Sequence, residues 1–201
     1  MPIAGPILGA QIAAKFATSG FTGAQTVTFS MALGNGIITN ILAMNIYNGS
    51  TFGTGPGPGI GTGKVVGLVG PIVGQNIYTM MVAKGFTGAQ TLTTAMAIGS
   101  AFAEHITLMG IVTSAGGPTA IGSGTGPIVG IVGATLGASI FQMLSASGFT
   151  GAQTLSTAMA IGDGIALSMS TAIVNTVIVG VPAPPLLGPI PVAGVEIGRL
   201  L

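Results

Sequence analysis

Few residues in this chain have side chains suited to catalysis or metal binding. The sequence contains one histidine, His105, no cysteine, and three carboxylates at Glu104, Asp163 and Glu196. Glu104 and His105 are adjacent, and adjacent side chains on a helix point about 100° apart, so they would not form a metal-binding pair. No second histidine or thiolate is present to complete such a site. The sequence therefore predicts no catalytic residue, no metal site and no cofactor, and a chain that is not an enzyme.

Two short motifs have the outline of known sites but lack support for the function. Gly61-Thr62-Gly63-Lys64 ends like a phosphate-binding loop. However, Pro58 stands where that loop has its first glycine, and Val65 stands where it has the hydroxyl that binds magnesium. Asn48-Gly49-Ser50 fits the acceptor sequence for N-glycosylation. Because Met1 to Pro6 carry no basic region of a secretory signal, we expect neither secretion nor glycosylation.

The strongest pattern is a heptad, Gly-Phe-Thr-Gly-Ala-Gln-Thr, that occurs three times. It begins at Gly20, Gly85 and Gly148, with offsets of 65 and 63 residues. Self-similarity at a nearly fixed period indicates copies of one structural unit. The elements around the heptads should therefore repeat as well.

Each heptad is typical of the end of one helix followed at once by the start of the next. Its first glycine suits the left-handed conformation just past a helix C-terminus, where a Cβ atom would be costly. Its first threonine and the glutamine three residues later match a capping box, in which each side chain binds a backbone N–H group. A turn this short joins antiparallel helices, so the sequence predicts three helical hairpins. The predicted turn residues are Gly20, Thr22, Gln25, Gly85, Thr87, Gln90, Gly148, Thr150 and Gln153.

The segments that flank the heptads have the periodicity of packed helices. Leu8, Ile12 and Phe16 recur every four residues, which predicts one buried stripe. The stripe returns at Val73, Ile77 and Met81 and again at Leu136, Ile140 and Leu144. After each heptad, small residues follow at helical spacing, which lets two helix backbones approach closely. We expect helix contacts at the glycines that occupy the same position in each unit, Gly34, Gly99 and Gly162.

These patterns predict an all-α fold of three tandem helical hairpins. The segments between hairpins are punctuated by glycine and proline throughout, so we expect connectors without regular helix. A proline-rich run from Pro182 to Pro191 predicts an extended C-terminal arm, lying on another subunit or on the body of the same chain. The predicted boundaries are 1–46, 70–113 and 133–180 for the hairpins, 47–69 and 114–132 for the connectors, and 181–201 for the arm.

The composition restricts the surroundings in which this chain is stable. Charged residues make up 3% of the sequence and hydrophobic residues 49%, and the mean hydropathy is +0.87. An ordinary domain has roughly 25% charged residues, and a free soluble monomer covers itself with charges of both signs. We therefore expect much of this surface to be buried against protein or lipid. No basic patch is present, which argues against nucleic-acid binding.

A multi-span membrane protein is one interpretation of this composition. The predicted second helices at about 92–113 and 155–180 approach the roughly 20 apolar residues of a membrane span. Against this interpretation, Glu104, His105 and Asp163 interrupt them, and tryptophan and flanking Lys/Arg clusters are missing. We favour a subunit of a large assembly, whose uncharged surfaces pack against copies of itself and other structural subunits.

The repeated heptads and the segment Gly59 to Lys64, Gly-Ile-Gly-Thr-Gly-Lys, also carry a resemblance to a known group of proteins. In these features the chain resembles the low-charge structural proteins of tailed-phage virions. The resemblance implies a structural role in a bacteriophage particle, in its head, neck, tail or baseplate. We therefore expect a virion component, with the membrane as the alternative location.

Overall fold

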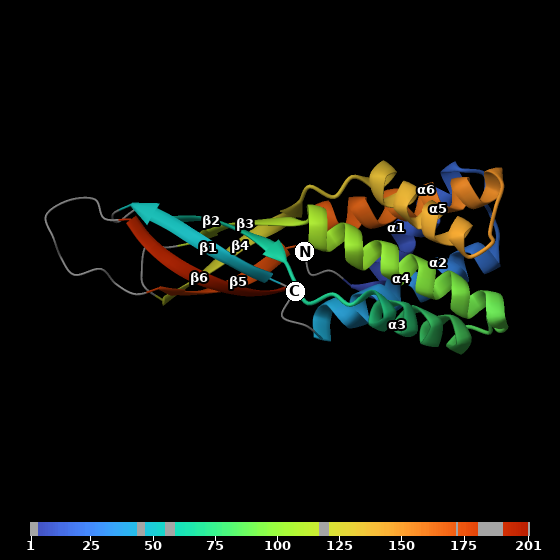
Figure 1. Ribbon diagram of the computed structural model, residues 1–201, viewed down its shortest axis with the longest axis horizontal. Helices are drawn as coiled ribbons and strands as arrows, with labels where there is room; N and C mark the ends of the chain where they lie inside the picture. The colour runs from blue at the N-terminus through green and yellow to red at the C-terminus, as the bar shows by residue number, and fades with distance from the viewer. Residues whose placement is uncertain are drawn as a thin grey trace, which may run out of the picture.

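The computed structural model is elongated, with a helical body at one end and a barrel of strands at the other (Figure 1). It describes residues 4–43, 47–54, 59–116, 121–171, 173–180 and 191–200. Within these ranges, a pair of helices is followed by a pair of strands three times along the chain.

The helical body is a closed ring. Its six helices are α1 (Gly5–Thr18), α2 (Ala24–Ala43), α3 (Gly70–Ala83), α4 (Ala89–Met109), α5 (Gly133–Ala146) and α6 (Ala152–Thr171). Each helix packs against its neighbours in the chain order, and α6 packs against α1 to close the ring. The predicted mainly helical character is therefore confirmed for this body.

The first helix of each pair buries the apolar stripe that the sequence predicts. Leu8, Ile12 and Phe16 of α1 are buried. The corresponding residues of α3 and α5 are buried in the same way, namely Val73, Ile77, Met81, Leu136, Ile140 and Leu144. α1 and α3 also begin with a proline in the first turn, where its missing N–H group is not needed.

Glycines set the close approach between the two helices of each pair. A Cβ atom added to Gly99 of α4 would lie 2.5 Å from the Cα atom of Gly74 of α3. The corresponding distances are 2.8 Å from Gly34 to Gly9 and 2.7 Å from Gly162 to Gly137. A real Cβ atom cannot occupy such a position, so the backbones touch where the sequence places small residues.

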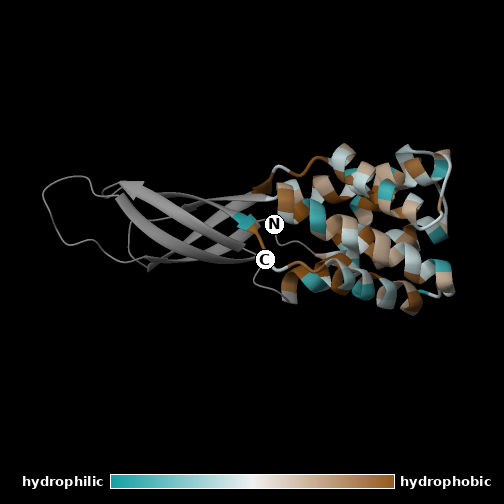
Figure 2. Cartoon of the chain, viewed as in Figure 1, coloured by the Kyte–Doolittle hydropathy of each residue, from teal (hydrophilic) through white to brown (hydrophobic). Residues whose placement is uncertain are grey.

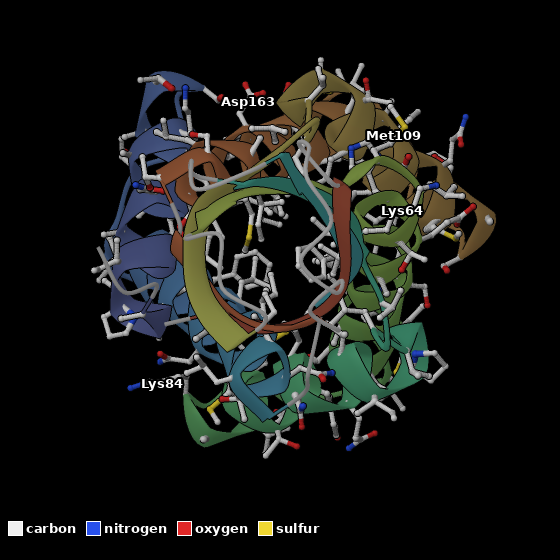
Figure 3. The ribbon with its side chains drawn as sticks, turned by 90° about the vertical axis from the view of Figure 1, so that its left-hand side faces the viewer. Lys64, Lys84, Met109 and Asp163 are labelled. Atoms are coloured by element: carbon white, nitrogen blue, oxygen red, sulfur yellow. The ribbon has the colours of Figure 1, made fainter. Side chains whose placement is uncertain are left out.

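The barrel is built from six strands, which the sequence reading did not predict. They are β1 (Tyr47–Thr54), β2 (Gly59–Val65), β3 (Ile111–Gly116), β4 (Ile121–Val129), β5 (Ile173–Gly180) and β6 (Pro191–Leu200). Neighbouring strands pair antiparallel in chain order, and β6 closes the barrel on β1, with Tyr47 opposite Gly198 and Thr54 opposite Pro191. Viewed along the long axis, the helices surround the same axis as the barrel (Figure 3).

The strands correct the all-α class and several predicted boundaries. β1 and β2 lie in the predicted connector 47–69, and β4 lies entirely in the connector 114–132. β3 begins inside the predicted hairpin 70–113, and β5 occupies the end of the predicted hairpin 133–180, because α4 and α6 end earlier than expected. The predicted arm 181–201 contains β6, which pairs with β1 and β5 of the same chain. The part of the arm at 181–190 lies outside the described residues.

Candidate functional site

The three heptads lie together at the free end of the helical body. The first four residues of each heptad lie in the turn within one helix pair, at 19–23, 84–88 and 147–151, and its last three begin the next helix. The strands connect to the other ends of these helices. The turns therefore lie at the end of the helical body away from the barrel (Figure 1). The ring thus presents three copies of one sequence on one face.

Each turn begins with a left-handed glycine that ends the preceding helix. The φ angles of Gly20, Gly85 and Gly148 are 85°, 88° and 91°. In the first turn, Gly20 N–H donates to the Ala17 carbonyl and Phe21 N–H donates to the Phe16 carbonyl, at 3.1 and 2.9 Å. These bonds satisfy carbonyl groups at the helix end in the Schellman arrangement. The same bonds recur at Gly85, Phe86, Gly148 and Phe149.

The phenylalanine of each heptad fixes the turn to the core. Phe21, Phe86 and Phe149 are half-buried and pack against the buried cluster. Phe21 meets Phe16 edge to face, with 5.7 Å between ring centroids, a favourable geometry for an aromatic pair.

The predicted capping boxes are wrong. α2, α4 and α6 begin at the alanine of each heptad, so the N-cap of α4 is Gly88, and it makes no side-chain capping bond. The second heptad glycine has a φ of 123°, 114° or 111° at Gly23, Gly88 and Gly151, which is not helical. Thr22, Thr87 and Thr150 therefore lie one residue before the cap position, where their hydroxyls do not cap the helix. The glycine beside each threonine readily adopts a positive φ, and this moves the cap position one residue past the threonine.

Most of each heptad is consequently free to meet another molecule. In all three copies the threonine, second glycine, alanine and glutamine are exposed, including Gln25, Gln90 and Gln153. The residue after each heptad is a large apolar side chain that is also exposed, by 47% at Val27, 40% at Leu92 and 43% at Leu155. We call the three heptads and these three apolar residues the turn surface.

One aromatic side chain distinguishes the three parts of the turn surface. Phe29 of α2 packs against Phe86 of the second turn, with 5.9 Å between ring centroids. Threonine occupies the corresponding position in α4 and α6, at Thr94 and Thr157. Beside Thr157 an open hollow of about 220 Å³ remains, lined by Phe16, Phe21, Gln25, Thr26, Phe29 and Thr157.

The titratable residues whose side chains the structure describes are not gathered into a site. Glu104 is exposed, whereas the adjacent His105 is buried, and this burial lowers the pKa of the His105 imidazole. Asp163 lies against Gly133 in the first turn of α5, where the helix dipole favours a negative charge. Asp163, Lys64 and Lys84 lie far apart around the ring (Figure 3). Among the described residues, no group of three or more His, Cys, Asp or Glu side chains could hold a metal ion.

The helical body has few strongly polar positions. Apolar and weakly polar residues cover most of it, and hydrophilic residues are scattered (Figure 2). Within the described ranges, none of the helices combines the length and the apolar character needed to cross a bilayer.

Comparisons with protein-family models, with curated proteins and with solved structures found no match for this chain. Its function is therefore inferred from its own residues. The turn surface offers hydroxyls, amides and apolar side chains three times over, which suits binding to protein and provides no reactive group.

Proposed function

We propose that this chain is a non-enzymatic structural subunit of a large protein assembly, a component of a bacteriophage particle, built from three copies of one helical hairpin. The observation that carries this proposal is the turn surface, in which the same exposed residues recur three times at one end of the ring. The assignment to a phage particle follows the resemblance of the heptads and the Gly59–Lys64 segment to virion structural proteins.

The exposure of the repeated residues is what distinguishes the turn surface from a structural repeat alone. The first heptad glycine ends the preceding helix, and the phenylalanine packs against the core. The exposed Gln25, Gln90 and Gln153 have no comparable structural role at the helix start, yet they are identical in the three units. Buried positions are identical only where a contact requires one residue type, and elsewhere they vary, as at Ile37, Phe102 and Ile165. Identity at exposed positions without a packing contact supports a binding role for these residues.

The chemistry of the turn surface fits a protein partner. The heptads contain no charged residue, and the cores of protein interfaces are depleted of charge. Each turn offers one exposed apolar side chain beside amide and hydroxyl groups, which is a weak site by itself. A partner that presents three matching sites binds all three turns at once, so the affinities reinforce one another. Copies of this chain and other structural subunits are the proposed partners, without nucleic acid.

Sedimentation of the full chain without detergent tests the assembly role. We expect large species for the unchanged chain and smaller ones for the triple variant Val27→Ser/Leu92→Ser/Leu155→Ser. A matched control is Leu42→Ser/Val69→Ser/Val132→Ser, which changes three similarly exposed apolar residues near the barrel end. The proposal fails if the unchanged chain is monomeric at every concentration, or if the turn variant and the control sediment alike.

Two further measurements separate the proposed location from the membrane alternative. Mass spectrometry of gradient-purified phage particles that encode this sequence should find the chain in stoichiometric amount. In liposome flotation, the chain should remain with the protein fraction. Carbonate-resistant flotation would favour a membrane protein instead.

A further inference from the structure

Three buried polar side chains occupy the same position in the three helix pairs. Asn40, His105 and Ser168 are separated by 65 and 63 residues, the offsets that relate the heptads. They are 2%, 5% and 1% exposed. Each has a buried atom without a hydrogen-bond partner, namely Asn40 Nδ2, His105 Nε2 and Ser168 Oγ. We call these three residues the polar ring.

The helix contacts place the polar ring on the inner side of the helical body. On α2, Gly34 faces α1 and Gly36, about 200° further round the helix, faces α3. Asn40 falls in the remaining arc, together with the buried residues Leu33 and Ile37. The opposite arc holds the exposed residues Thr39 and Leu42. His105 and Ser168 have the same places on α4 and α6, so all three side chains are directed toward the interior of the ring.

Unpartnered polar atoms in a protein interior require an explanation. Buried polar groups are almost always hydrogen-bonded, to protein or to a bound small molecule. Gln11 Oε1 and Ser145 Oγ are isolated exceptions, but here the exception occurs at the same level of all three second helices. Apolar residues would fit this position at no polar penalty, as they do one turn earlier at Ile37, Phe102 and Ile165.

The three atoms share one chemical property. The Asn40 amide nitrogen and the Ser168 hydroxyl donate hydrogen bonds, and the His105 Nε2 atom donates in one tautomer of the neutral imidazole. Burial lowers the pKa of His105 and so favours this neutral form. The three donors lie at the same level of three helices around one axis, so a position on that axis is the one that all three share.

We propose that Asn40, His105 and Ser168 hold one small hydrogen-bond acceptor, a water molecule or a halide ion, in the interior of the helical ring near its barrel end. Water and a halide can accept hydrogen bonds from the same three donors, but a halide brings a negative charge and a larger radius, whereas water also has protons to donate. This site does not depend on the assembly role of the turn surface. It gives the polar ring a ligand that links α2, α4 and α6, which lie in three different helix pairs.

The direction in which a substitution changes the melting temperature distinguishes a bound ligand from polar groups that have no partner. If the polar atoms have no partner, Asn40→Leu removes a desolvated amide and raises the melting temperature. If the ring holds a ligand, the same change breaks one of its bonds and lowers the melting temperature, which is the result we expect. Asn40→Ser, which introduces the residue of the third unit, should lose less. Ser30→Ala is the matched control, since Ser30 is buried but already donates to the Thr26 carbonyl, and alanine occupies its position in the other units.

A crystal structure of the unchanged chain tests the proposal directly. We expect one isolated density peak at hydrogen-bond distance from the three donor atoms, about 2.7–3.2 Å for water and longer for a halide. An anomalous signal at that peak in bromide-containing crystals assigns a halide, and an unchanged oxygen-sized peak in halide-free buffer assigns water. A high-resolution map without a peak there, or a raised melting temperature for Asn40→Leu, overturns the proposal.

Discussion

The helical ring and the barrel constrain their sequences in different ways. In the ring, particular residues recur because particular contacts need them, such as Gly99 against Gly74 and Phe86 at the turn. In the barrel, backbone pairing defines the structure, and the strands that follow the three helix pairs share little sequence. β1, β3 and β5 read Tyr-Asn-Gly-Ser-Thr-Phe-Gly-Thr, Ile-Val-Thr-Ser-Ala-Gly and Ile-Val-Asn-Thr-Val-Ile-Val-Gly. Close helix packing preserves sequence between repeats, whereas the strands that follow the helix pairs have diverged, although β2 and β4 share Gly-x-Gly-Thr-Gly.

The strongest way to break the ring is to fill one of its glycine contacts. Gly99→Leu inserts a side chain where two backbones touch, and we expect a loss of about 3 kcal/mol or more in the free energy of unfolding. Thr107→Leu, an exposed change on the same helix, should have little effect. Chemical denaturation of both variants measures the difference. Equal stability of the two would mean that α3 and α4 are not in backbone contact.

The barrel can be opened without touching the ring. Deleting residues 191–201 removes β6, which pairs with both β1 and β5. Because the helices pack on one another, we expect the helical circular dichroism signal and its melting to persist, while the exposed strand edges promote aggregation. Loss of the helical signal would show that the ring depends on the closed barrel.

A smaller effect should follow from changing the glycine that ends a helix. Gly85 has a φ of 88°, and a β-branched residue adopts this conformation badly. We expect Gly85→Val to cost about 1–3 kcal/mol of stability. Thr87→Ala in the same turn should cost less than about 0.5 kcal/mol, because its hydroxyl does not cap the helix. Thermal unfolding of the two variants measures both losses. A larger loss for Thr87→Ala would support the capping box after all.

The pH dependence of stability isolates the one histidine of the chain. The pKa of His105 lies below its ordinary value of 6.5 in the folded state because of burial. The unfolded chain therefore binds a proton as the pH falls below about 6.5, before the folded chain does, and stability decreases by at most about 1.4 kcal/mol per pH unit. Stability should be independent of this group above that pH. His105→Asn, which introduces the residue found at position 40, should flatten the profile between pH 7 and 5, and an unchanged profile would contradict the assigned burial.

The sequence predicts features that depend on near neighbours better than features that depend on distant ones. The buried stripe of α1 follows from the spacing of Leu8, Ile12 and Phe16 alone. The start of α4 depends on whether Thr87 or Gly88 takes the N-cap position, and the residue types alone do not decide between them. β5 is rich in β-branched residues from Ile173 to Val179, a strand signal that lies inside the predicted hairpin 133–180. The glycine-rich β2 has no such signal, and closure of β6 on β1 joins segments more than a hundred residues apart.

The features of the turn surface also divide into those that the sequence predicts and those that it does not. Its repetition and the left-handed glycines follow from the heptad itself. The exposure of the glutamines does not, because it depends on where each helix begins. The buried polar ring was visible only as a correspondence between Asn40, His105 and Ser168, and its lack of partners requires the packed structure.

The most direct test of the assembly role asks whether the three turns act as equals. Gln25→Glu, Gln90→Glu and Gln153→Glu each place one charge at the same position of an identical heptad. We predict that each single change raises the dissociation concentration of the assembly, measured by sedimentation, by a similar factor of about ten, equivalent to about 1.4 kcal/mol. The triple variant should then be dispersed. A strong effect at one turn with none at the other two, or no effect at any, would contradict a threefold turn surface.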